Sequence, residues 1–107
     1  MSGLSEREQA FENKFAHDDE IRFKVIARRN KLLGLWAAEQ MGLTADKAEE
    51  YAKEVVTADF DEPGEEDVFR KVYGDLKARG LEISEHRVRR RMEDLIVEAK
   101  NQIMNEV

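Results

Sequence analysis

An acidic stretch near the middle of the chain offers the closest approach to a metal-binding motif in the sequence. Asp59 and Asp61 stand at the first and third positions and Gly64 at the sixth, as in the opening half of an EF-hand calcium loop. The fifth position is Pro63 and the twelfth is Arg70, where calcium needs a bidentate glutamate. We therefore predict an acidic turn between two helices, and no metal site.

Signatures of catalysis are missing from the rest of the sequence. There is no P-loop, no glycine-rich dinucleotide turn, no H-E-x-x-H helix and no nucleophile elbow. The two histidines, His17 and His86, lie far apart, and the chain has no cysteine for disulfides, zinc or redox chemistry. We therefore predict a protein that binds a partner, without enzymatic activity and without a cofactor.

Arginine side chains are candidates for recognition. Arg22 and Arg29 fall on or beside the apolar face of the predicted first helix, and Arg28 lies next to Arg29. In one interpretation, the stems pack while the charged heads reach solvent or pair with the acidic middle of the chain. In the other, these arginines contact a partner or an anion. The sequence leaves both open.

The run from His86 to Arg91 forms a basic patch near the start of a predicted helix, where the helix dipole disfavours cations. One interpretation is a solvated face whose arginines pair with nearby acids, namely Glu82, Glu85, Glu93 and Asp94. The other is a nucleic-acid surface that also uses Arg28, Arg29 and Lys31, with steeply salt-dependent binding. The net charge of −6 disfavours nucleic acid, because such binding depends mainly on neutralising phosphates.

The composition predicts one all-α domain. The 107 residues are rich in good helix formers, contain a single proline and show no strand-like alternation. No apolar run approaches the roughly 18 residues of a membrane span, and the N-terminus lacks an apolar signal core. We therefore expect a soluble intracellular protein.

Turn signals and apolar spacing divide the chain into four helices. A capping box at Ser5 and the later Gly42 predict a first helix from Ser5 to Met41, far longer than most globular helices. Its apolar row is Ile21, Val25, Leu32 and Trp36, and the same face is broadened by Phe11, Phe15, Ile26, Leu33 and Ala37. The other helices are predicted at residues 44–58, 65–79 and 84–105. Small alanines on the second helix suit close approach of another helix, and the short connections favour an antiparallel four-helix bundle.

The start of the long first helix is too polar to pack by itself. Apart from Met1, the large apolar side chains of residues 1–20 are Leu4, Phe11 and Phe15, among many charged residues. We therefore divide the chain into an N-terminal arm, residues 1–20, and a bundle domain, residues 21–107. The arm is expected to be loosely packed or disordered when free and to become ordered against a partner.

Several stretches of the chain form a recognisable set. The most specific is Ala27-Arg28-Arg29-Asn30-Lys31-Leu32-Leu33-Gly34, followed by Trp36-Ala37-Ala38. Others are Lys14–Asp18, Phe23–Lys24, Tyr51–Val56, Ala58–Phe60, Gly64–Val68 and Arg70–Val72. Together they resemble the ζ subunit of alphaproteobacterial F-type ATP synthases. The resemblance extends over nearly the whole chain, most closely over residues 11–72 and more loosely beyond Gly80.

This resemblance implies a four-helix bundle with an inhibitory N-terminal arm. In that family the arm enters an interface between α and β subunits of the catalytic head, close to the γ shaft, and blocks rotation in the hydrolysis direction. The implied partners are the α, β and γ subunits, with no nucleic acid and no direct membrane insertion. The implied location is cytoplasmic, peripheral to the inner membrane through the ATP synthase.

We expect the arm to bind through two aromatic anchors, Phe11 and Phe15. Leu4 adds an apolar contact, and polar contacts are expected from Glu12, Lys14, His17, Asp18 and Asp19. His17 is also a candidate pH sensor, because the neighbouring carboxylates favour its charged form. The alternative function is a small helical module that binds nucleic acid or a small ligand.

Overall fold

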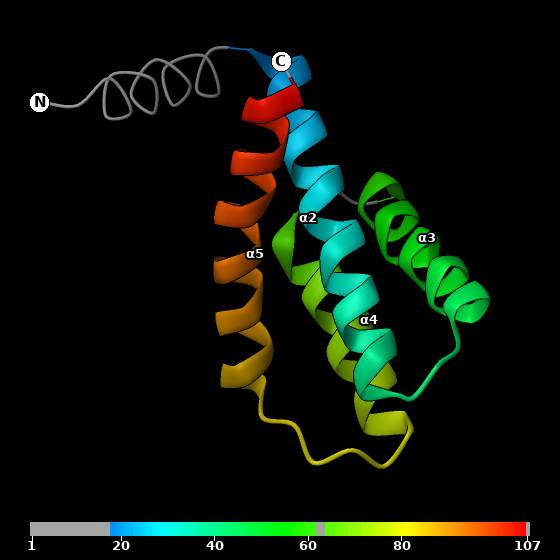
Figure 1. The fold of residues 1–107 in the computed structure, drawn as a ribbon. Coiled ribbons are helices and arrows are strands. Elements are labelled where there is room, and N and C mark those ends of the chain that lie inside the picture. Colours follow the sequence, from blue (N-terminus) through cyan, green and yellow to red (C-terminus); the bar gives the residue numbers. More distant parts are fainter. Residues whose placement is uncertain (1–17, 62–63, 107) are drawn as a thin grey trace, which may run out of the picture.

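Helices account for most of the computed structural model, which describes residues 18–61 and 64–106. These residues form α2 (Asp19–Gln40), α3 (Ala45–Asp61), α4 (Glu65–Ala78) and α5 (Glu85–Glu106), as Figure 1 shows. Neither of the two described ranges contains a strand. The predicted all-α four-helix bundle is therefore confirmed.

The helix at the start of the bundle begins later than predicted. Asp18 has an extended backbone, with φ −113° and ψ 104°. Its Oδ1 accepts hydrogen bonds from the N–H groups of Glu20 (3.0 Å) and Ile21 (3.2 Å), so Asp18 is the N-cap of α2. The predicted continuous helix from Ser5 to Met41 is therefore wrong at Asp18, where the aspartate side chain competes for backbone N–H groups. The capping box at Ser5 lies outside the described residues.

Most other helix ends agree with the prediction, because local chemistry determines them. Gly42 and Gly80 have positive φ values of 71° and 78°, and their N–H groups bond to carbonyls in the last turns of α2 and α4. Ser84 Oγ accepts a hydrogen bond from the Arg87 N–H at 3.1 Å, which confirms the predicted N-cap of α5. The exception is α3, which continues to Asp61 and ends later than predicted.

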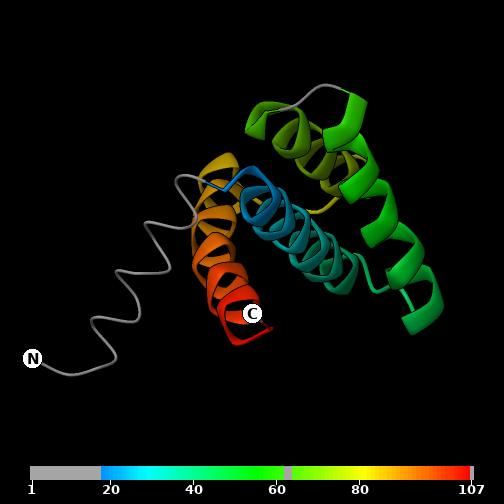
Figure 2. The same ribbon diagram turned by 90° about the horizontal axis from the view of Figure 1, so that it is seen from above.

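Helix α2 lies at the centre of the bundle and packs against each of the other three helices. Helices α5 and α3 run along different sides of α2, and α4 completes the bundle (Figures 1 and 2). The last turns of α5 lie beside the first half of α2, where Arg28 bonds to Gln102 and Glu106. The point where the arm joins the bundle is therefore close to the end of the C-terminal helix.

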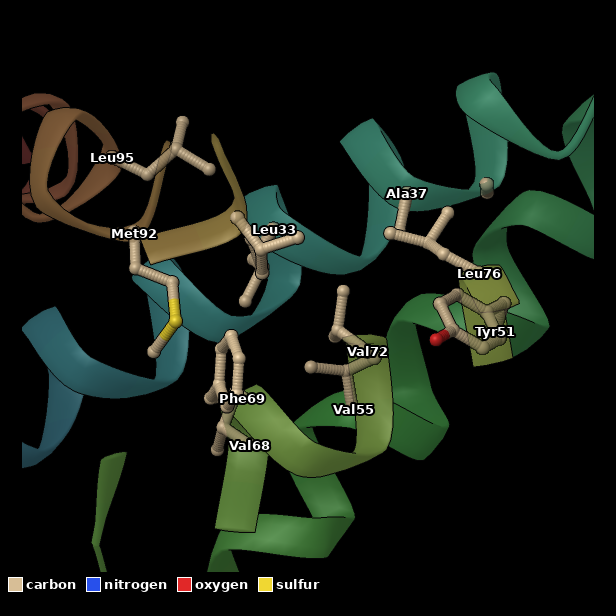
Figure 3. Close-up of a cluster of buried hydrophobic side chains, with 12 residues drawn as sticks. Leu33, Ala37, Tyr51, Val55, Val68, Phe69, Val72, Leu76, Met92 and Leu95 are labelled. Atoms are coloured by element: carbon tan, nitrogen blue, oxygen red, sulfur yellow. The ribbon is translucent and has the colours of Figure 1, made fainter. Parts of the chain in front are cut away.

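Two apolar clusters hold the helices together. The main core draws on all four helices, and Leu33, Val55 and Val72 are fully buried within it (Figure 3). The terminal core is smaller and joins the start of α2 to the end of α5 through Ile21, Val25, Ala99 and Ile103. The buried residues of α4 and α5 belong to these two clusters, namely Val68, Phe69, Val72 and Leu76 on α4 and Val88, Met92, Leu95, Ala99 and Ile103 on α5.

The buried face of α2 includes Ile21 and Val25 of the predicted row, and then follows the residues that were expected to broaden it. Leu32 and Trp36 are only partly buried against the clusters, whereas Leu33 and Ala37 are fully buried. The apolar pattern on α2 is ambiguous because α2 packs against three helices, so apolar side chains on more than one side of it are buried.

Helices α2 and α3 approach each other closely at Gly34. A Cβ atom on this residue would lie 2.7 Å from the Ala52 Cα and 3.2 Å from a methyl carbon of Val55. Glycine is therefore required at this crossing. The expectation that small side chains on α3 allow close approach of another helix is confirmed here.

Candidate functional site

The described residues contain the root of the predicted arm. Asp18 and Asp19 fall within them, whereas the other predicted arm contacts lie outside, namely Leu4, Phe11, Glu12, Lys14, Phe15 and His17. Asp18 caps α2, and the Asp19 side chain is fully exposed, 3.8 Å from Arg22 Nη1. Contact of Asp18 and Asp19 with a partner stays a prediction.

Two of the three candidate arginines have different surroundings. Arg22 lies at the root of the arm with its side chain half exposed. Arg28 is more enclosed, since its Nη1 donates to Gln102 Oε1 at 2.7 Å and its Nη2 donates to Glu106 Oε1 at 2.8 Å. Arg28 therefore ties α2 to α5, while Arg22 presents its guanidinium to solvent. Partner or anion contact by either arginine stays a prediction.

The third candidate, Arg29, is buried, with only 2% of its side chain exposed. Its Nε donates to Asn30 Oδ1 at 2.8 Å, and its Nη1 donates to Glu65 Oε1 at 3.2 Å, at the start of α4. Arg29 therefore pairs with the acidic middle of the chain, as one interpretation predicted, and contact of Arg29 with a partner or an anion stays a prediction. Sequence reasoning missed the burial of Asn30, whose Nδ2 has no hydrogen-bond partner within the described part of the chain.

Two arginines of the basic run on α5, Arg89 and Arg90, are paired with acids. Arg89 donates to both carboxylate oxygens of Glu66 at 3.0 and 3.1 Å, and to Glu85 at 3.4 Å. Arg90 Nε lies 3.4 Å from Asp94. The predicted pairing with Glu85 and Asp94 is confirmed. Glu66 was missed because it comes from another helix, and its hydrogen bonds with Arg89 lower the pKa of its carboxyl group.

A basic hollow of about 450 Å³ lies beside the first turns of α5. Its lining includes Trp36 from α2 and three arginines, namely Arg87, Arg90 and Arg91. The Arg91 Nε is buried and has no hydrogen-bond partner among the described residues. This hollow keeps the ligand-binding alternative open.

A polar contact joins α3 to α4. Tyr51 Oη donates a hydrogen bond to Asp75 Oδ2 at 2.8 Å, and Lys71 Nζ lies 3.1 Å from the same oxygen. Burial, together with the hydrogen bond to the Asp75 carboxylate, raises the pKa of the Tyr51 phenol above its ordinary value of 10.0. The phenol proton is therefore held more tightly in the folded protein than in the unfolded chain.

Alkaline pH should weaken the fold through Tyr51. The stabilisation is complete below the unfolded pKa of about 10 and declines as the pH rises above it, because only the unfolded chain then releases the proton. We expect the urea midpoint of the parent to fall more steeply above this pH than that of Tyr51→Phe. The phenolate absorbance of Tyr51, obtained as the difference between the parent and Tyr51→Phe, should appear only as the protein unfolds. Ionisation of Tyr51 near its ordinary pKa in the folded protein would contradict the prediction.

Two adjoining hollows lie along α2 on the side that faces α3, and Ile103 and Glu106 at the end of α5 also line the first of them. The first, of about 480 Å³, includes Phe23 on α2 and Val56 on α3 in its lining. The second, of about 400 Å³, is lined by Ala52 and Lys53 among others, and Lys31 and Val56 line both hollows. We name this surface the α2–α3 groove.

Neither a metal site nor a membrane-crossing helix is found in the described ranges. No group of three or more His, Cys, Asp or Glu side chains there is arranged to hold a metal ion. The Gly64 N–H donates to Asp59 Oδ1 at 3.4 Å, a contact within the acidic turn. None of the described helices has the length and apolar character needed to cross a membrane.

Comparison with known proteins identifies the family. The sequence profile of the ATPase inhibitor subunit zeta family matches residues 1–102, nearly the whole chain. The chain belongs to this family. A structure solved by NMR in solution is 52% identical to this zeta-family chain, with a TM-score of 0.72 over 81% of this chain and 99% of that one. No curated protein matches the sequence significantly.

Membership of the zeta family supports a role as an inhibitor of ATP synthase. It agrees with the absence of catalytic signatures in the sequence, since an inhibitor subunit regulates an enzyme and need not catalyse a reaction itself. The zeta-family profile also begins at residue 1, so it includes the arm as well as the bundle. The resemblance proposed from Ala27–Gly34 and the other stretches is therefore confirmed.

Proposed function

We propose that this chain inhibits ATP hydrolysis by inserting its arm, residues 1–20, at an interface between α and β subunits of the ATP synthase head, close to the γ shaft. The observation that carries the proposal is the match of the ATPase inhibitor family to the arm as well as to the bundle. An arm held at this position obstructs rotation in the hydrolysis direction while leaving synthesis much less affected.

The composition of the arm is typical of a segment whose few apolar side chains become buried when it binds a partner. Phe11 and Phe15 lie four positions apart, so they share one face if the arm is helical. Burying each ring contributes roughly 1.5–3 kcal/mol, which helps to offset the conformational entropy lost on ordering. Leu4 extends the apolar contact, and the polar contacts come from Glu12, Lys14, His17, Asp18 and Asp19.

The bundle, residues 21–107, remains outside the cleft and limits how far the arm can enter. The Asp18 cap supports a division close to this one, because the backbone is extended at Asp18 and α2 begins at Asp19. The proposed partners are the α, β and γ subunits, and the proposed location is the cytoplasmic side of the inner membrane, through the ATP synthase. Nucleic acid and direct membrane insertion play no part in this proposal.

Removing the arm should abolish inhibition. The experiment adds the full chain, or a chain lacking residues 1–17, to the cognate ATP synthase head and measures ATP hydrolysis. The shorter chain keeps Asp18, so α2 retains its cap and circular dichroism should show the bundle intact. We expect the full chain to inhibit and the shorter chain to leave hydrolysis unchanged.

A full-length variant separates the loss of the aromatic anchors from the loss of chain length. Phe11→Ser combined with Phe15→Ser should weaken inhibition at least tenfold, since each ring contributes more than the roughly 1.4 kcal/mol that corresponds to a factor of ten. If neither the parent nor the variants change the hydrolysis rate, the proposed function is wrong for this chain.

A further inference from the structure

An aromatic side chain is exposed on α2, close to the root of the arm. Phe23 is 52% exposed, and the other large hydrophobic side chain exposed in the described part of the chain is Val97, at 58%. Phe23 lines the α2–α3 groove, whereas Val97 lies on α5 and lines neither of its hollows. Covering an exposed aromatic ring in a pocket is among the most favourable contacts that an interface gains.

We propose that the α2–α3 groove is a second contact surface for the ATP synthase, and that it binds an acidic amphipathic segment of the catalytic head beside the cleft that receives the arm. This inference rests on the proposed function, and it extends the inhibitory surface beyond the arm. It assigns a partner of stated chemistry to a part of the bundle surface where an aromatic ring is half exposed.

The shape of the groove suits a short helical or extended segment. Phe23, Ala27 and Val56 provide apolar lining, and the lining residues of α2 extend from Phe23 to Lys31. At 1.5 Å per residue this stretch is about 12 Å long, which accommodates roughly two turns of a partner helix. Helix-in-groove recognition uses apolar side chains spaced over such a length.

The charge of the groove indicates an acidic partner. Lys24, Lys31 and Lys53 line it, although the chain as a whole has a net charge of −6. Among the described residues, no ion pair engages Lys31 or Lys53. Lys24 lies 3.6 Å from Glu20 in a pair with both side chains at least half exposed, and such a pair is worth little and is easily exchanged.

The two acids of the lining do not cancel this positive charge. Glu106 is already bonded to Arg28 at 2.8 Å, so this carboxylate and guanidinium neutralise each other. Glu49 lies in the second hollow together with Lys31 and Lys53, which leaves an excess of one positive charge there. Carboxylates on a partner can therefore reach lysines at both ends of the groove.

The groove lies close to the root of the arm, so the protein that binds the arm can also contact the groove. Phe23 lies four residues after the start of α2, about 6 Å along the helix axis from Asp19. A protein that holds the arm up to this point is therefore within reach of the groove. Two linked contacts strengthen binding beyond either one, because the second forms within an existing complex.

Inhibition of ATP hydrolysis by full-length variants tests the groove. Phe23→Ser should raise the half-inhibitory concentration roughly tenfold or more, while the control Val97→Ser should stay within about twofold of the parent. Both residues are exposed, so thermal melting should show all three proteins folded. Lys31→Glu should also weaken inhibition, more strongly at low salt than at high salt, because the lost attraction is screened by ions.

The outcomes separate this inference from the proposed function. If the parent does not inhibit, the proposed function fails. If the parent inhibits and Phe11→Ser with Phe15→Ser abolishes the effect, but Phe23→Ser behaves like Val97→Ser, the groove inference alone is overturned. It is also overturned if Phe23→Ser leaves inhibition intact and instead dissociates a dimer in sedimentation, or releases the chain from anionic vesicles or DNA.

Discussion

Replacing Gly34 by alanine should destabilise the bundle by roughly 2 kcal/mol, although alanine is the better helix former. The added Cβ would lie 2.7 Å from the Ala52 Cα, a backbone atom that cannot rotate away, so α2 and α3 must separate. Overpacking costs roughly 1–3 kcal/mol and occasionally more, and a contact with backbone belongs at the upper end. The gain in helix propensity returns only about 1 kcal/mol.

Gly74 provides the matched control for this experiment. It lies inside α4, and a Cβ atom there would meet nothing within 4 Å. Gly74→Ala should therefore stabilise the protein by roughly 0.5–1 kcal/mol, through helix propensity alone. Thermal melting should show Tm falling by roughly 10 °C for Gly34→Ala and rising slightly for Gly74→Ala. Equal stabilisation by both substitutions would contradict the prediction, because it would mean that α2 and α3 leave room for a Cβ atom at Gly34.

Features determined by neighbouring residues could be predicted from the sequence. Gly42 and Gly80 end helices because a positive φ favours glycine, and Ser84 begins α5 because its hydroxyl accepts a local N–H. These signals depend on a few consecutive residues, so no knowledge of the tertiary structure is needed. The number and order of the helices follow from the same signals.

Features that depend on competition or on distant residues were predicted less well. The choice at Asp18 between continuing a helix and capping one is finely balanced, because aspartate does either, and the capping box at Ser5 favoured continuation. The burial of Arg29 depends on Glu65, which lies on another helix. An arginine whose partner is remote in the sequence looks the same as one that faces solvent.

The candidate site was predicted only in part. The arginine positions on α2 were identified from their place beside an apolar face. The sequence did not predict which guanidinium is buried and which is exposed. The α2–α3 groove was not anticipated, because it arises from the crossing of two helices, and Phe23 is an ordinary apolar residue in the sequence pattern. The aromatic anchors Phe11 and Phe15 lie outside the described residues and stay predictions.

Replacing Arg29 by alanine should destabilise the protein by roughly 3 kcal/mol or more, through lost packing and lost hydrogen bonds inside the bundle. The substitution empties the space of a long side chain that is 2% exposed, a change that costs roughly 2–5 kcal/mol for buried side chains of similar length. It also removes the donor to Asn30 Oδ1, and leaving a buried polar group without its partner adds roughly 1–3 kcal/mol.

Two further variants separate these contributions. Arg29→Met keeps most of the side-chain volume and loses the hydrogen bonds. Its free energy of unfolding should therefore lie between those of the parent and Arg29→Ala. Arg28→Ala, at the adjacent position, removes a partly exposed side chain and should cost about 1 kcal/mol or less. Urea unfolding measures all three, and equal effects of Arg28→Ala and Arg29→Ala would contradict the difference in burial.

The same variants test whether Arg29 acts only inside the bundle or also contacts a partner. If Arg29 acts only within the bundle, inhibition of ATP hydrolysis by Arg29→Met should match that of the parent once the folded fraction is taken into account. A direct contact would instead weaken inhibition by a folded Arg29→Met protein. We expect the first result, because the guanidinium is already bonded to Asn30 and Glu65 and little of it is accessible to another protein.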